Sequence, residues 1–424
     1  MRISTSTMYE QGVSSLQSQT SRLMQIQQQI GASRRILTPA DDPSGSARVL
    51  EISQSQAISQ QYDANIGAAT DSLSFEEVVL TNITEVLQSA RDLTNAAGNG
   101  SYSQSDRLTL ANALRGQYQE LLGLTNSTDS SGQYLFAGYQ SATRPFSQVS
   151  TGNVTYNGDQ GQRLMQVGPG RRIEVSDSGQ SLFRTIPGGN GNFVTAAPNT
   201  NAGTGIIDTG NTLDAAKWNN VANSKDYTIK FAVVAGVTSY DIVDNKSVGP
   251  LSLLTGLATA AAGPYPRPYT SGSAISFSQA GPPAFDYGAE LSISGAPANG
   301  DTFTVKPSTT QDVFKTMDAL ATLLETAASP TALNNGLVGL QRNLDNALNN
   351  VISTRSSVGS RLKELDDLKN GNDSLGLQYS QSLSRLQDLD YAKAASDFAQ
   401  QQVTLQAAQQ SFVKISGLSL FNYL

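Results

Sequence analysis

The hydrophobic positions near both ends of the chain recur every seven residues. Near the N-terminus the repeat consists of Tyr9, Leu16, Leu23, Ile30 and Leu37. Near the C-terminus it consists of Tyr391, Phe398, Leu405 and Phe412. A seven-residue apolar repeat keeps one narrow seam of a helix facing a partner helix, as in coiled coils. The pattern therefore predicts that each end is a long helix that needs a partner.

The positions between these seam residues are mostly Gln, Ser, Thr and Ala. Few opposite-charge pairs are present that could stabilise a lone helix. We therefore expect both ends to be weakly ordered alone and to become stably helical when another helix covers the seam. An intramolecular helical hairpin and packing between separate chains both satisfy the pattern, and the shortage of charges favours packing between chains.

The first helix is predicted to run from about Thr5 to Leu37, because the residue before Pro39 is disfavoured in a helix. A second helix should start at Pro43 with Asp42 as its N-cap. The pair Asp41 and Asp42 is thus interpreted as a turn and a cap rather than as a metal site or an acid/base dyad. This helix carries another heptad repeat, formed by Ile66, Leu73, Leu80 and Leu87.

A third helix is expected from about Ser105 to Asn126, followed by a strand-like aromatic run from Tyr134 to Tyr139. Helix should return at Thr310 and continue after Pro330. Its seam is formed by Leu337, Leu344, Val351, Val358 and Leu365. We expect a break at residues 370–373, Asn-Gly-Asn-Asp, before the C-terminal repeat begins.

Between about Thr143 and Pro307 the sequence consists of short strand-like segments separated by turn signals, which predicts antiparallel β structure. The first set is Val154–Tyr156, Leu164–Val167 and Arg172–Val175. The second set is Tyr227–Val234, Ser239–Val243, Ala274–Phe277, Glu290–Ile293 and Thr302–Val305. A Gly- and Asn-rich stretch separates the two sets, so we expect two β modules, the second a candidate insertion.

The predicted fold is α+β and multidomain, with long coiled-coil helices from both termini and antiparallel β outer modules. Residues 1–40 with 373–424 should form a terminal coiled-coil domain, and residues 41–142 with 310–372 a helical rod domain. Residues 143–186 should form the first β module, and residues 187–309 the second.

Composition excludes several classes of function. The net charge of −7 without a Lys/Arg cluster disfavours nucleic acid and anionic membranes as partners. The chain has no His and no Cys, which removes the usual metal and haem ligands, the Cys nucleophiles and the commonest general base. We therefore expect no enzyme activity, no cofactor and no metal site. Two Ser-x-x-Lys matches, at Ser360 and Ser411, lie in heptad helices and lack the companion motifs of that enzyme class.

Several segments resemble the flagellin family of bacterial flagella. They are Met1–Thr5, Leu37–Leu50, Gly132–Gly138, Asn349–Leu368 and Gly417–Phe421. The Tyr134–Gly138 run and the ending with Leu418, Leu420 and Phe421 are most similar to the members that form the hook-filament junction. The resemblance implies that both termini form a coiled-coil inner layer around the export channel, with those three residues extending the assembly seam. It is weakest between about Pro187 and Val305.

The resemblance also implies a role and partners. The chain would be a structural subunit that joins the flagellar hook region to the filament, without catalysis. Its partners would be copies of itself in a ring, a hook-side junction protein (hook-associated protein 1), flagellin and a flagellar export chaperone. It would be secreted by the flagellar type III apparatus into the flagellum, in line with an N-terminus without an apolar signal segment. Two alternatives are a filament flagellin and a secreted surface-binding protein that displays its β modules.

Overall fold

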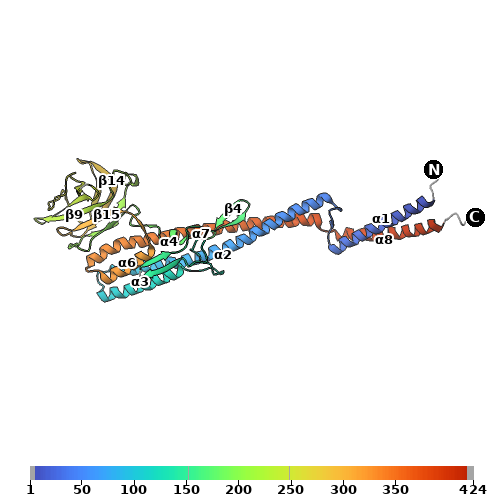
Figure 1. The fold of residues 1–424 in the computed structure, drawn as a ribbon, viewed down its shortest axis with the longest axis horizontal. Coiled ribbons are helices and arrows are strands. Elements are labelled where there is room, and N and C mark those ends of the chain that lie inside the picture. Colours follow the sequence, from blue (N-terminus) through green and yellow to red (C-terminus); the bar gives the residue numbers. More distant parts are fainter. Residues whose placement is uncertain (1–4, 151, 248, 418–424) are drawn as a thin grey trace, which may run out of the picture. The chain divides into compact units, whose positions relative to one another are not determined.

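The computed structural model describes residues 5–150, 152–247 and 249–417. Figure 1 shows the helices and strands of these residues. The chain divides into two compact units. The terminal unit contains the residues up to 67, residues 166–171 and the residues from 366 on. The central unit contains residues 68–165 and 172–365. Each unit is described by itself.

Six long helices account for both ends of the chain and for the rod of the central unit. They are α1 (Thr5–Ala32), α2 (Pro43–Ala97), α3 (Gln104–Leu124), α6 (Val313–Thr326), α7 (Pro330–Gln387) and α8 (Tyr391–Gly417). Two short helices, α4 (Gly179–Phe183) and α5 (Ala215–Trp218), lie among the strands. Helices from both ends of the sequence with antiparallel β structure between them confirm the predicted fold class. None of the described helices is both long enough and apolar enough to cross a membrane.

The first helix ends earlier than predicted. Helix α1 stops at Ala32, because Ser33 adopts a positive φ of 58° and Arg34 forms an antiparallel bridge with Asp388. Leu37 therefore lies in the turn that follows, and not on the helix. Its backbone N–H donates to the Asp41 carboxylate at 3.0 Å, a bond that fixes a turn conformation.

The predicted break at residues 370–373 is also wrong, because α7 runs through this polar segment to Gln387. The Asn372 amide donates to the backbone oxygen of Ser59 on α2 at 2.9 Å, so tertiary contacts override the weak helix propensity. The chain leaves the helix at Asp388 instead. It restarts after Asp390, whose carboxylate accepts the backbone N–H of Lys393 at 3.1 Å.

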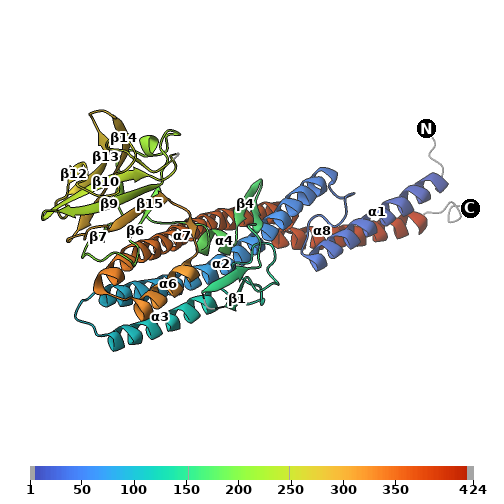
Figure 2. The same ribbon diagram turned by 60° about the vertical axis from the view of Figure 1, so that its left-hand side comes forward.

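The inner heptad repeats of α2 and α7 are confirmed as core positions, and all of them except Ile66 lie in the central unit. All four seam residues of α2 and all five of α7 are buried. Helices α3 and α6 pack beside them, as Figure 2 shows. Tyr118 of α3 meets Phe314 of α6 edge to face at 6.1 Å. Arg115 holds Glu325 at 2.8 Å and Asp318 at 3.1 Å.

The first β module is a set of short paired strands on the rod helices. Its strands are β1 (Phe146–Ser150), β2 (Asn153–Tyr156), β3 (Leu164–Gly168), β4 (Arg171–Glu174) and β5 (Ile186–Pro187). The pairs are β1 with β2, β3 with β4, and β5 with β16 (Thr310–Gln311), and the first and third of these are antiparallel. The segment from Tyr134 to Tyr139 is not the predicted strand. Only an isolated bridge between Tyr134 and Thr128 is present, and the residues that follow Tyr134 form turns.

The second β module has two sheets around one aromatic core. One sheet has the order β11-β10-β9-β15-β6, with β12 on β10, and the other has the order β13-β14-β7, with β8 on β14. The bounds are β6 Phe193–Ala196, β7 Ile206–Ile207, β8 Asn211–Thr212, β9 Tyr227–Val234, β10 Val237–Asp244, β11 Leu251–Ser252, β12 Arg267–Pro268, β13 Ala274–Gln279, β14 Phe285–Ser294 and β15 Thr302–Pro307. All five predicted strands are present. Trp218 is fully buried in this core and donates its indole N–H to Asn192.

Candidate assembly surface

The terminal unit contains an antiparallel pair of helices, α1 and α8 (Figures 1 and 2). At one end the rings of Tyr9 and Phe412 lie 5.1 Å apart. At the other end the hydroxyls of Ser33 and Tyr391 hydrogen-bond. The start of α1 therefore meets the last part of α8, and the end of α1 meets its start. The two sequence ends that each required a helical partner provide one for each other.

Most predicted seam residues lie at this helix pair but are only partly covered. Half-buried side chains are Leu16, Leu23, Ile30, Phe398, Leu405 and Phe412. Tyr9 is 55% exposed and Tyr391 is 53% exposed. Leu37 is half-buried in the turn after α1, away from the helical repeat. Leu418, Leu420 and Phe421 lie outside the described residues.

A second set of seam positions lies between the first, and apart from Ile26 it is formed by small or amide residues that the search for large apolar side chains did not find. This second set consists of Gly12, Gln19, Ile26, Ala394, Gln401 and Ala408, all of which are half-buried or buried. Together the two sets give the alternating three- and four-residue spacing of a coiled coil. A Cβ atom on Gly12 would lie 2.7 Å from the ring of Phe412, so the glycine makes room for that ring. The signal in the sequence was the seven-residue spacing of small and amide residues.

The middle of the helix pair contains a polar layer. The Gln401 amide donates to the backbone oxygen of Gln19 at 3.4 Å. The Gln19 amide nitrogen bonds to Ser15, and its buried Oε1 has no partner among the described residues. A polar residue at a seam position of a coiled coil specifies register at a cost in stability. This layer opposes sliding of α1 along α8.

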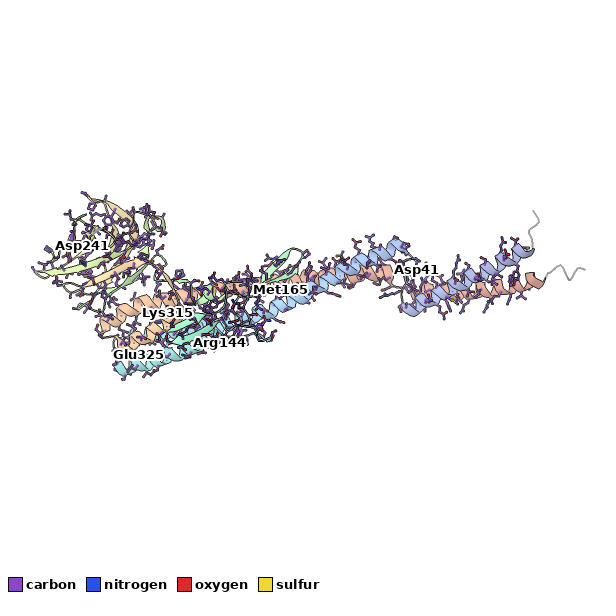
Figure 3. All side chains as sticks on the ribbon, viewed as in Figure 1. Asp41, Arg144, Met165, Asp241, Lys315 and Glu325 are labelled. Atoms are coloured by element: carbon purple, nitrogen blue, oxygen red, sulfur yellow. The ribbon has the colours of Figure 1, made fainter. Side chains whose placement is uncertain are left out.

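The turn after α1 is held by its two aspartates. The Asp41 carboxylate accepts the backbone N–H groups of Leu37 and Thr38, at 3.0 and 2.8 Å, and the amide of Gln25 at 2.7 Å. The bonds from Thr38 and then Leu37 lower the pKa of Asp41. Asp42 accepts the backbone N–H of Gly45 at 2.8 Å, as an N-cap of α2 does. The interpretation of the pair as a turn and a cap is confirmed. Figure 3 labels Asp41 at this turn.

Arg35 links three helices of the terminal unit. Its backbone N–H donates to Gln387 at 2.7 Å and its guanidinium to the backbone oxygen of Leu386 at 2.9 Å, both at the end of α7. Its backbone oxygen accepts the amide of Gln29 on α1 at 2.7 Å. The guanidinium also pairs with Asp42 at 3.4 Å. The turn therefore fixes the end of α1 against both neighbouring helices.

The outer faces of α1 and α8 expose apolar side chains. Met8 is 46% exposed, Met24 57%, Val403 65% and Val413 67%. The charged side chains of these helices are only Glu10, Arg22, Lys393, Asp397 and Lys414. A helix pair with exposed apolar residues and few charges can pack against further helices with little electrostatic repulsion. The chemistry of this surface is that of helix packing. Among the described residues no cluster of three or more potential metal-binding side chains was found.

Known proteins are similar to this chain over most of its length. The bacterial flagellin N-terminal helical region matches residues 3–141, and the bacterial flagellin C-terminal helical region matches residues 342–424. FlgL of Xanthomonas campestris is 30% identical; the match covers 73% of this chain and 93% of that chain, with a TM-score of 0.59. The chain belongs to the bacterial flagellin family, a class of structural proteins of the flagellum.

Within this family the similarity extends to the junction proteins. Flagellar hook-associated protein 3 of Salmonella typhimurium is 26% identical over 421 residues, 99% of each chain. The flagellar junction protein FlgL of Legionella pneumophila is 28% identical; the match covers 81% of this chain and all of that chain, with a TM-score of 0.66. The resemblance predicted from the terminal motifs is thereby confirmed.

Proposed function

We propose that this chain is the structural subunit that joins the flagellar hook region to the flagellin filament. It assembles as a ring of identical copies, between a hook-side junction protein (hook-associated protein 1) and flagellin, and it catalyses no reaction. The names of its relatives, hook-associated protein 3 and flagellar junction protein, support this role. The observation that carries the mechanism is the incomplete burial of the helix pair α1 and α8.

Assembly completes this burial. Fully burying a Leu or Phe side chain contributes roughly 1.5 to 3 kcal/mol, so a half-buried seam residue retains about 1 kcal/mol for contacts with a neighbouring subunit. The six half-buried seam residues and the exposed Met8, Met24, Val403 and Val413 are the groups that neighbours would cover. Burial of these groups offsets the entropy lost when the ends become ordered. The assembly seam is thus formed by Tyr9, Leu16, Leu23, Ile30, Tyr391, Phe398, Leu405 and Phe412, extended by Leu418, Leu420 and Phe421.

The same property suits export. A subunit that passes unfolded through the flagellar type III apparatus must keep its ends loose until it reaches its place. Opposite charges at i,i+3 or i,i+4 spacing, which would stabilise a lone helix, are absent from the sequence of α1 and occur once in that of α8, at Lys393 and Asp397. An export chaperone would cover the apolar seam before secretion, and the neighbouring subunits would replace it afterwards.

A label on the second β module tests the position of the subunit. Since the chain has no cysteine, Val221→Cys gives one reactive thiol at a fully exposed position of this module. Biotin-maleimide and gold particles would then be located by electron microscopy on intact flagella of cells carrying this variant. We expect one band beside the hook. Gold along the full filament would identify a flagellin instead. Flagella without gold would refute the proposal that the chain is a subunit of the flagellum.

The role of the β modules needs a separate variant. Deletion of residues 187–309 removes the second β module and keeps the helical matches to the flagellin family. If the helices carry assembly, cells with the deleted protein still form filaments. A surface-binding protein that only displays the module would give a different result. Deleting the whole gene would then leave filament formation unaffected, and deleting the module alone would abolish surface binding.

A further inference from the structure

Within the central unit, the second β module leaves and rejoins the rod through a two-stranded neck. The strands β5 and β16 pair there, with Gln311 opposite Ile186. Gly188 donates to the backbone oxygen of Thr309 at 3.0 Å, and Ser308 donates to that of Asn192 at 2.9 Å. The entering and leaving chains are therefore hydrogen-bonded to each other. A neck of this kind could still swing as a unit unless another element holds it.

Two asparagines of α7 hold the neck. The Asn343 side-chain oxygen accepts the backbone N–H of Gly189 at 2.9 Å. The Asn346 amide donates to the backbone oxygens of Pro187 and Gly189, each at 2.8 Å. Gln311, in the returning strand, donates its amide to the backbone oxygen of Asn343 at 2.6 Å. Both neck strands are thus bound directly to one stretch of α7.

A third asparagine holds the body of the module. The Asn335 side chain accepts the backbone N–H of Ile207 at 3.0 Å and donates to the backbone oxygen of Gly205 at 2.9 Å. The two groups flank Ile206, and a residue in a neighbouring parallel strand would make the same pair of bonds. Among the described strands, β7 pairs with β14 alone, so the amide of Asn335 occupies the place of a further strand. The Asn335 side chain is buried, which makes its loss costly for both backbone groups.

The three asparagines act from one face of the helix. Positions 335, 343 and 346 lie within about 80° of one another at 100° per residue. The side-chain contacts of all three go to backbone atoms of residues 187–207, so they do not depend on the side chains of the module. Arg342 adds a bond from its guanidinium to the Thr209 hydroxyl at 3.2 Å. One helix face therefore contacts the neck and the module at once.

We propose that Asn335, Asn343 and Asn346 form an amide clamp that fixes the direction of the second β module on the rod. The module is then a rigid outer part of the subunit, and not a domain on a flexible tether. These asparagines are positioning residues, since they act by orienting another part of the protein. The proposal concerns a single subunit and does not depend on its place in the flagellum.

The test measures the spread of distances between the module and the rod. The cysteine-free chain accepts two spin labels, at Val221→Cys in the module and Leu108→Cys on α3, both exposed positions of the central unit. Pulsed electron-spin resonance then gives a distance distribution for the full chain. We expect one narrow peak in the parent protein and a broad distribution after Asn335→Ala, Asn343→Ala and Asn346→Ala are combined. Asn349→Ala, at an exposed position of the same helix, is the control and should leave the peak narrow.

Folding of the module is monitored separately. Emission of the lone Trp218, buried in the module core, must stay unchanged for a broad distribution to report loss of orientation. If the triple variant unfolds, Asn335→Ala alone is followed by hydrogen exchange, and the Ile207 amide should lose protection before the central strand β9 does. A broad distribution in the parent protein would overturn the proposal. So would a triple variant with a narrow peak, or unchanged protection of Ile207 in Asn335→Ala.

Discussion

A buried acid in the rod gives a sharp prediction about stability and pH. Glu76 of α2 is 1% exposed, and its Oε1 accepts the backbone N–H of Asp177 at 3.2 Å. Its Oε2 is buried without a partner among the described residues. Asp177 is paired with Arg361 of α7, which leaves Glu76 without a counter-ion of its own. Burial, and after it the nearby Asp177 carboxylate, raise the pKa of Glu76 to about 8.

The sign of the effect follows from where the proton is bound. Between its ordinary pKa of 4.5 and about 8, Glu76 keeps its proton in the folded protein and loses it in the unfolded chain. The folded state therefore binds more protons, and stability falls as pH rises through this interval. At about 1.4 kcal/mol for each pH unit, the loss reaches up to about 5 kcal/mol by pH 8 and then levels off. Glu76→Gln, which is neutral at every pH, removes this loss.

Urea unfolding followed by helix circular dichroism between pH 5 and 9.5 measures the difference. We expect Glu76→Gln to match the parent protein near pH 5 and to exceed it increasingly up to about pH 8. The matched control is Glu77→Gln, since Glu77 is partly exposed and paired with Arg355 at 2.9 Å. The free energy of unfolding of Glu76→Gln is compared with that of the parent at pH 5 and pH 9. An equal difference at both pH values would refute the claim that buried Glu76 is protonated in the folded protein.

Two further substitutions test packing. Gly12→Leu should abolish incorporation into flagella, because a side chain there collides with the Phe412 ring. Gly31→Leu on the same helix meets open space and should be tolerated. Gold labelling of flagella from cells that carry each variant measures the incorporation. Phe314→Ala removes a fully buried ring that contacts the rings of Tyr118 on α3 and Phe146 on β1, and urea unfolding should show a loss of about 3 to 5 kcal/mol. Phe75→Ala, 44% exposed, should change stability by about 0.5 kcal/mol or less.

The sequence predicted the parts of the fold that depend on large apolar side chains. The inner heptads of α2 and α7 are buried as predicted, because apolar residues that recur with the helical period lie on one face of a helix, and that face packs into the core. The five longer strands of the second β module were also predicted, because β-branched and aromatic residues gather between turn glycines.

Features decided by tertiary partners could not be predicted in this way. The break at residues 388–390 depends on Arg34 and Arg35 reaching the end of α7, and in the sequence only Asp390, a possible N-cap, marks it. Glu76 and Asn335 look like ordinary polar residues of helices, whose burial depends on the chain that packs over them. Gly12 and Gln19 complete the seam between α1 and α8, but only the position of Phe412 and Gln401 shows why.

The central claim is that the pair α1 and α8 is only half covered in the free subunit and is buried completely on assembly. Hydrogen exchange measured by mass spectrometry, on the purified subunit and on isolated hook-filament junctions, tests it directly. We predict that amides of residues 7–30 and 391–412 exchange much more slowly in the junction, while those of the buried rod core around Leu80 and Val351 change little. Equal exchange of both terminal helices in the two samples would contradict the account.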